Sequence, residues 1–298
     1  DWQPAPPNGW RRSDEPGALA LPLYEGKMVQ MFDHRAADVV VNPANLKRPA
    51  QQQEIPSAQK VDPARYPRPQ FWVEVSPEPS FVLGFKLITA PTNARTMIAA
   101  LLPSAAAGNS LGLLFSEAGS AEAPRSQCLL VATLNCLALD FMLRQKVQGQ
   151  NINWFIVEQL PVIAPVDFDA PLGNETIGDF VCREVLRLTY TAHDMAAFAK
   201  DLGDVDAQGT VRPPFVWDES DRRRRMALLD ALFMHLYGIG RDDAAYILDS
   251  FPIVREKDEA AHGEYLTRRL VLQAMDEIAS GGLARLAALS PAARRHGD

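Results

Sequence analysis

Residues 126–146 place the strongest constraint on how this chain of 298 residues can fold. The stretch contains neither Gly nor Pro, and apolar side chains fill nearly every position from Cys128 to Leu143. This pattern predicts a helix of about five and a half turns. Because the helix is apolar on almost every side, it must be buried. The rest of the chain must therefore supply a core that surrounds it.

The stretch that follows this helix, RQKVQGQNINWFIVEQLPV from Arg144 to Val162, is crowded with basic and amide side chains. It then returns to the apolar run Trp154–Val157, which we expect to lie in the same core. The sequence thus predicts a polar loop that is held at a helix end and anchored on both sides. On composition alone, such a loop fits DNA reading and a polar protein interface equally well.

The two parts of the chain differ in their hydrophobic patterns. Before Pro165, short runs of β-branched and aromatic residues predict strands, and after it helical periodicity dominates. Strands are expected within residues 21–32, 38–41, 71–75, 80–89, 96–103 and 110–116, and helices within 174–200, 221–237, 242–250 and 262–280. We therefore predict an α+β protein. A domain of residues 1–165 has a small mixed β-sheet, and an acidic α-helical region covers residues 166–298.

Residues 42–69 interrupt the first domain with several prolines, three consecutive glutamines and few apolar residues. Long segments of this composition are usually functional loops or linkers. We therefore expect a mobile loop here.

The net charge of −7 is unevenly distributed. Residues 1–165 contain 14 acidic and 14 basic side chains, whereas residues 166–298 contain 23 acidic and 16 basic ones. A DNA-binding surface is therefore expected in the first part. The overall acidity argues against a nonspecific DNA-binding protein, since phosphate neutralisation supplies most nonspecific affinity.

The three cysteines are too few and too scattered for a disulfide framework or a zinc site, which favours a reduced intracellular compartment. No apolar run reaches the roughly 18–20 residues that a membrane-spanning helix needs. We expect a cytoplasmic protein that has no membrane partner.

Several short patterns resemble catalytic or metal-binding signatures, but their surroundings favour structural roles. Gly108–Gly112 fits G-x-S-x-G, yet the strand before it and the helix after it are missing, so a turn is favoured. Glu259 and His262 have a metal-ligand spacing without the second histidine, which favours a solvated helix face. The arginines Arg222–Arg225 spread around a helix and are expected to form local ion pairs. Neither a P-loop nor a dinucleotide fingerprint occurs.

Four stretches carry a resemblance to a known family. They are LPLYEGKMVQMFDHR (Leu21–Arg35), TNARTMIAALLP (Thr92–Pro103), LNCLALDFMLRQKVQGQNINWFIVEQLPV (Leu134–Val162) and HLYGIGRDDAAYILDSFPIVREKDEAAHGEY (His235–Tyr265). In this order they resemble the C-terminal part of large bacterial adenine-specific DNA methyltransferases. These are the fused restriction-modification enzymes and the DISARM-type phage-defence methylases.

The resemblance implies that residues 1–165 are a target recognition domain similar to that of type I specificity subunits, which presents loops to double-stranded DNA. It also implies a catalytic domain outside this chain that binds S-adenosylmethionine and flips the target adenine out of the stack. The Asn/Asp-Pro-Pro-aromatic tetrapeptide of that domain is absent, because NPAN (Asn42–Asn45) and RPPF (Arg212–Phe215) match it only in part. We therefore assign this chain no catalytic residue, no metal site and no cofactor of its own.

The predicted function is DNA sequence recognition for an N6-adenine DNA methyltransferase of a restriction-modification or phage-defence system. The polar stretches supply side chains that read base edges or hold phosphates. The candidate DNA contacts are Lys27, Gln30, His34, Arg35, Arg144, Gln145, Lys146, Gln150 and Asn151. The same side chains could instead dock the catalytic domain of the parent protein. The alternative function is a noncatalytic scaffold of a defence complex that does not contact DNA. It predicts that residues 1–165 have no basic concave face.

Overall fold

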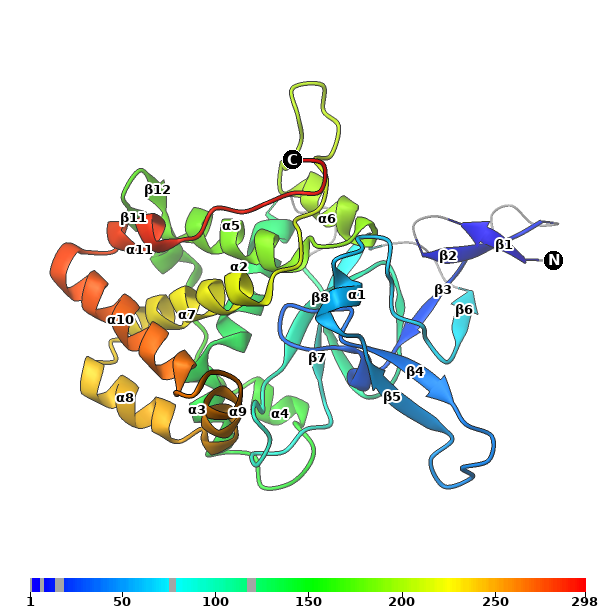
Figure 1. Cartoon of the computed structure of the whole chain (residues 1–298), viewed down its shortest axis with the longest axis horizontal. Coiled ribbons are helices and arrows are strands. Elements are labelled where there is room, and N and C mark those ends of the chain that lie inside the picture. The colour runs from blue at the N-terminus through cyan, green and yellow to red at the C-terminus, as the bar shows by residue number, and fades with distance from the viewer. Residues whose placement is uncertain (1, 6–7, 14–18, 75–78, 117–121) are drawn as a thin grey trace.

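A computed structural model describes residues 2–5, 8–13, 19–74, 79–116 and 122–298 (Figure 1). The described residues form an α+β fold, as the sequence predicts. In Figure 1 the strands lie mainly on one side of the molecule and the long helices on the other.

The strands form several small sheets rather than one. The first sheet has the antiparallel order β1 (Trp2–Ala5), β2 (Gly9–Arg12), β3 (Leu19–Tyr24) and β6 (Trp72–Glu74), and β9 (Ala106–Ala107) pairs with β3 in parallel. The second has the antiparallel order β10 (Leu111–Leu114), β7 (Phe81–Lys86) and β8 (Ala99–Pro103). Strands β4 (Ala37–Val41) and β5 (Ala50–Glu54) form a separate antiparallel hairpin.

The buried helix is present, but it is divided into α2 (Ala123–Asn135) and α3 (Leu137–Arg144), which meet at 57°. Cys136 between them has an extended backbone, and the Leu137 N–H donates to the Asp230 carboxylate at 2.7 Å. The prediction of one continuous helix is wrong because this carboxylate satisfies and stabilises a helix N-terminus inside the apolar stretch. Among the described residues no single helix is both long and apolar enough to cross a bilayer. Taken together, the bent pair α2 and α3 reaches that length and apolar content.

Polar side chains near the bend attach α2 and α3 to the second sheet. The Asn135 amide exchanges two hydrogen bonds of 2.9 Å with the backbone of Ala99 in β8. The fully buried Asp140 carboxylate accepts the N–H groups of Thr96 and Met97, each at 3.1 Å, and Arg95 Nε at 2.6 Å. These contacts fix the segment that leads into β8.

Helices dominate after residue 165. They are α5 (Ile177–Thr189), α6 (Ala196–Asp201), α7 (Glu219–Leu236), α8 (Arg241–Asp249), α9 (Pro252–His262), α10 (Leu266–Gly281) and α11 (Ala284–Leu289). A capping box of Thr176 and Asp179 begins α5. Helix α9, which sequence periodicity does not predict, begins at Pro252 and ends at Gly263, whose φ of 74° suits glycine.

The remaining elements are short. They are η1 (Gly26–Met28), α1 (Ser57–Lys60), α4 (Trp154–Val157), η2 (Pro165–Asp169), η3 (His193–Met195) and the two-residue strands β11 (Pro171–Leu172) and β12 (Glu175–Thr176).

One hydrophobic core extends through both predicted regions. Its main cluster joins side chains of β7, β8 and α2 with those of α5 and α7. Phe81 packs edge-on against Phe198, with ring centroids 5.2 Å apart. Residue 165 therefore marks a change from strands to helices rather than a gap in the packing.

The segment 42–69, which is predicted to be a mobile loop, contains regular structure. It contains β5 and α1, and its Ile55 and Lys60 side chains are buried. The composition does not predict these elements, because β5 pairs along its whole length with β4 and the Arg35 guanidinium donates to carbonyl groups at the end of α1 and just after it. Both partners lie outside the segment, so its own composition does not reveal them.

Candidate nucleic-acid interface

A cleft of about 860 Å³ is lined by residues from both the strand-rich and the helical part of the molecule. Its lining comes from the β4–β5 hairpin, the residues after β3, the end of β7, the segment 92–95, and helices α7 and α9. The fixed loop around Arg95 and the helix break beside Asp230 both contribute to its surface. We call this feature the basic cleft.

The basic cleft has an excess of cations although the chain as a whole is acidic. Six of its lining side chains are Lys or Arg and three are Asp or Glu. Three of the cations have carboxylate partners: Lys27 with Glu25 at 3.0 Å, Lys60 with Asp33 at 2.6 Å, and Arg95 with Asp140 at 2.6 Å. The other three are Lys86, Arg223 and Lys257, and within the described residues no carboxylate lies at ion-pair distance from them. Cations of this kind are available to an anionic ligand.

Lys86 is the last residue of β7 and is half-buried in the cleft. Burial lowers the pKa of its ammonium group to about 8, and the charge of Asp33 opposes that shift. Desolvation disfavours the charged form of a lysine unless an opposite charge lies close to it. A phosphate in the cleft would supply that charge.

Asp230 of α7 brings a carboxyl group with an unusual pKa to the same cleft. Burial raises its pKa to about 6, although Arg95 and the hydrogen bond from the Leu137 N–H both act in the opposite direction. Its negative charge therefore develops only as the pH rises through about 6, which keeps the cleft more positive in mild acid.

The structure divides the nine predicted DNA contacts into three groups. Lys27 and Gln30 line the basic cleft. Gln145, Lys146, Gln150 and Asn151 are exposed in the loop between α3 and α4. That loop is fixed through its backbone, because Thr89 N–H donates to the Gln150 carbonyl at 2.9 Å and Ile88 forms a bridge with Asn151. The loop residues are not part of the cleft lining.

His34, Arg35 and Arg144 have structural partners instead. His34 is buried and lies 2.9 Å from Asp194, and Arg35 is fully buried. The Arg35 guanidinium donates to Thr191 as well as to carbonyl groups at the end of α1 and just after it. Neither side chain is at the surface, so the prediction of direct DNA contact is wrong for both.

Arg144 braces the segment 92–95 that lines the cleft. Its guanidinium lies 4.0 Å from the Phe251 ring centroid and donates to the carbonyl groups of Asn93 and Ala94 at 2.7 and 2.9 Å. Those contacts use the Nη2 donors and one face of the guanidinium, so less of the group is left for a base or a phosphate. Arg144 therefore supports the segment 92–95 without itself lining the cleft.

The apolar run Trp154–Val157, which is predicted to lie in the core, is only partly buried. Ile156 is buried, whereas Trp154 is 43% exposed and Phe155 is 59% exposed. The run forms the single turn α4, and a helical turn points its side chains in different directions, so they cannot all reach the core. Trp154 still packs edge-on against Phe85.

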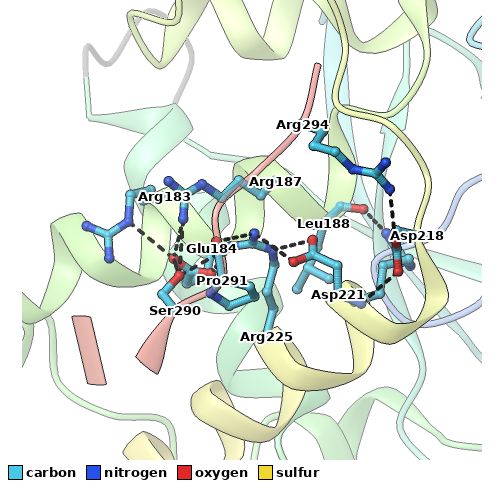
Figure 2. A network of polar contacts seen from close by, with 11 residues as sticks. Arg183, Glu184, Arg187, Leu188, Asp218, Asp221, Arg225, Ser290, Pro291 and Arg294 are labelled. Carbon is cyan, nitrogen blue, oxygen red and sulfur yellow. Dashed lines mark hydrogen bonds and ion pairs between the residues drawn. The ribbon is translucent and has the colours of Figure 1, made fainter. Parts of the chain in front are cut away.

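The arginines Arg222–Arg225 have four different surroundings. Figure 2 shows the buried Arg225, which binds Glu184 at 2.5 Å, both Asp221 oxygens, and the Pro291 carbonyl. Arg222 stacks on Trp217 at 3.8 Å, Arg223 lines the cleft, and Arg224 is exposed. The predicted local ion pair is thus confirmed for Arg225 with Asp221.

The other short patterns have the structural surroundings that the sequence favours. Residues 108–112 form a turn into β10, and the Ser110 hydroxyl accepts the Gly26 N–H at 2.8 Å. Glu259 pairs with Arg255 on the exposed face of α9. In the described part of the chain, no group of three or more His, Cys, Asp and Glu side chains is arranged to hold a metal ion.

Sequence reasoning misses Lys86, Arg223 and Lys257. Lys86 is the one charged residue in the strand stretch SFVLGFKLIT, which is the only local signal for it. Arg223 is hidden in a run of four arginines, and Lys257 lies in a helix that periodicity does not predict. Comparisons with protein-family models, curated proteins and solved structures find no match for this chain.

Proposed function

We propose that this chain is the DNA sequence recognition portion of an N6-adenine DNA methyltransferase, and that the basic cleft holds the DNA backbone. The observation that carries the proposal is a concave site with three cations that have no carboxylate partner within the part of the chain that the structure describes. Neutralising phosphates with Lys and Arg supplies most of the affinity of proteins for DNA. The scaffold alternative predicts no basic concave face on residues 1–165. Of the three unpaired cleft cations, Lys86 lies in that part of the chain, and Arg223 and Lys257 belong to the helical part.

The sequence resemblance supplies the rest of the proposal. The parent protein would contribute a catalytic domain that binds S-adenosylmethionine, and this chain would carry neither the cofactor nor the reacting groups. Recognition and chemistry would then be separate tasks, with this chain selecting the site at which an adenine is flipped out. We place the protein in the cytoplasm, where bacterial DNA lies.

The test compares two triple variants that remove the same charge. Lys86→Ala/Arg223→Ala/Lys257→Ala removes the unpaired cations of the cleft. Arg241→Ala/Arg255→Ala/Arg268→Ala removes three exposed arginines that each pair with a carboxylate. Affinity for duplex DNA is measured at several salt concentrations.

We expect the cleft variant to lose about tenfold or more in affinity, and its salt slope to fall by roughly 2–3 because three phosphate contacts disappear. The control variant should resemble the unmodified chain. Equal losses in both variants would contradict the cleft as the interface, and failure of the unmodified chain to bind duplex DNA at low salt would contradict the function.

One observation favours the scaffold as a second candidate function. Ile88, Trp154 and Phe155 are between 43% and 59% exposed, on segments that adjoin the loop of residues 145–151. Clustered exposed apolar side chains are typical of protein interfaces. Copurification with other defence proteins, combined with no measurable DNA binding, would favour this role.

A further inference from the structure

The β4–β5 hairpin projects from the body of the molecule (Figure 1). Five residue pairs form its ladder, from Ala37 opposite Glu54 to Val41 opposite Ala50, and residues 42–49 form its tip. Side chains of Ala37, Gln52 and Glu54 line the basic cleft, so the cleft-facing side of the hairpin continues its wall. A ligand that fills the cleft therefore lies beside the hairpin.

The base of the hairpin is braced on its other side. Asp38 accepts Arg65 Nη2 at 2.5 Å and the Arg68 N–H at 2.8 Å, and the Val39 N–H donates to the Arg68 carbonyl. These contacts hold the ribbon at a fixed angle to the cleft. A recognition element that is ordered before binding loses less conformational entropy when it binds.

The tip is also ordered by its own hydrogen bonds. The Asn42 and Asn45 side chains accept the backbone N–H groups of Ala44 and Arg48, at 3.0 and 3.1 Å. The Gln51 side chain donates to the Arg48 carbonyl at 3.1 Å. The amide side chains of the tip therefore stabilise its backbone conformation.

Within the described residues, three consecutive side chains at the apex form no such hydrogen bonds. Leu46, Lys47 and Arg48 are exposed, and at 89% Leu46 is the most exposed large apolar side chain among the described residues. Lys47 and Arg48 are the only ionisable residues between Val39 and Gln53, so the outer part of the hairpin carries two positive charges. A single exposed leucine is common on protein surfaces, but beside two cations at the apex of a projecting ribbon it suits a surface that presents both phosphates and methyl groups.

The dimensions of a two-stranded ribbon match one feature of DNA. Paired strands lie about 4.8 Å apart, and the major groove is about 12 Å wide, so the groove admits a β-ribbon with its side chains. There an arginine can bind both acceptors of guanine, and an apolar side chain can contact the thymine methyl group.

We propose that the β4–β5 hairpin inserts its tip into the major groove of DNA held at the basic cleft, and that Arg48 and Leu46 read base edges there while Lys47 holds a phosphate. This inference rests on the proposed function. The cleft supplies affinity that does not depend on sequence, and the hairpin supplies the choice of sequence.

The experiment measures base preference separately from affinity. The full chain is used to select from a pool of DNA duplexes with a randomised centre, and the selected duplexes are sequenced. Four single variants are compared with the unmodified chain: Arg48→Ala, Arg48→Lys, Leu46→Ala and, as a control, Gln208→Ala. Gln208 is exposed in the turn between Val205 and Val211, a separate projecting loop (Figure 1).

We expect the unmodified chain and the control to select the same short sequence. Arg48→Ala should relax the preference at one guanine by about tenfold or more. Arg48→Lys should relax it as well but leave the salt slope unchanged, because lysine keeps the charge and loses the bidentate fork. Leu46→Ala should weaken selection of a thymine. Thermal melting of each variant checks that the fold is retained.

The experiment distinguishes failure of the hairpin proposal from failure of the proposed function. If the unmodified chain selects a sequence and both Arg48 variants select it equally well, the hairpin does not read bases, although the proposed function stands. Binding by the unmodified chain without any preference contradicts both the hairpin proposal and sequence recognition, and leaves the cleft only as a site of nonspecific DNA binding. If the unmodified chain retains no duplex, both proposals are wrong.

Discussion

Arginine side chains occur both in the basic cleft and in the polar network around Glu184, but the two sites use them differently. In the network, Glu184 binds Arg183, Arg187 and Arg225, and the Arg225 side chain is fully buried (Figure 2). In the cleft, Lys86, Arg223 and Lys257 face a concave space without a carboxylate partner among the described residues. Arg223 and Arg225 are two residues apart in the same helix.

The number of cations in a segment therefore says little about how many of them are available to an anionic ligand. A guanidinium that is matched by carboxylates joins elements of the fold, here α5, α7 and the segment at Ser290 and Pro291. A guanidinium or ammonium group that is left unmatched in a concave site can attract an anion from outside.

The largest expected effect is on stability, from Arg225→Ala. The substitution removes a fully buried guanidinium that joins Glu184 to Asp221 and donates to the Pro291 carbonyl, which costs about 3 kcal/mol of unfolding free energy even though Arg183 and Arg187 still pair with Glu184. Arg223→Ala, in the same helix, should cost less than about 0.5 kcal/mol because it removes no such contact. Urea denaturation of both variants measures the contrast. Similar losses would show that the two regions do not differ in the way described.

A smaller effect on stability should come from Asp230, whose pKa is raised to about 6. The folded state holds this proton up to about pH 6, whereas the unfolded chain releases it near pH 4. Its contribution to stability is therefore present below about pH 4 and is lost as the pH rises through 6. Between about pH 5 and 7.5 the loss is on the order of 1 kcal/mol.

Asp230→Asn keeps the hydrogen bond acceptor for Leu137 and removes the titration. Denaturation curves at several pH values should show that the variant lacks this part of the pH dependence. An unchanged slope would mean that Asp230 is ionised across the range.

The third prediction concerns the cleft cation Lys86, whose pKa is lowered to about 8. DNA affinity should fall a few-fold between about pH 7 and pH 9 as the ammonium group loses its proton, because about one phosphate contact weakens. Lys86→Arg stays charged across this range and should show a flatter profile. Parallel profiles for the two proteins would contradict a role for Lys86 in binding.

The smallest effect is expected from Arg241→Ala. Arg241 pairs with Asp276 at 2.6 Å, but both side chains are more than half exposed. Solvent and salt screen such pairs, so the variant should keep the melting temperature and the DNA affinity of the unmodified chain. A clear drop in either would show that pairing at the surface matters as much as pairing in the interior.

The sequence predicts what periodicity and composition control. The α+β class, the position of the buried helix and the strands at β7, β8 and β10 all follow from local patterns. The bend at Cys136 does not, because it depends on Asp230, which lies 93 residues further along. The burial of His34 depends in the same way on Asp194.

The candidate site was harder to predict for a similar reason. Lys27 and Gln30 are found from their own stretch, but the cleft also needs Lys257 from α9 and Gln52 from the hairpin. Whether a cation is matched by a carboxylate is a property of the fold, since Lys60 and Asp33 pair across 27 positions. Composition reports the cation and not its partner.

The shared core sets a limit on how this molecule can be divided or recombined. A cut at residue 165 would separate Phe81 from Phe198 and expose apolar surface of α2, which packs against α5. A chimaera in which residues 1–165 alone were exchanged would therefore have a poorly packed core. The hairpin tip, residues 42–49, makes its hydrogen bonds largely within itself, so its sequence can be replaced without opening that core.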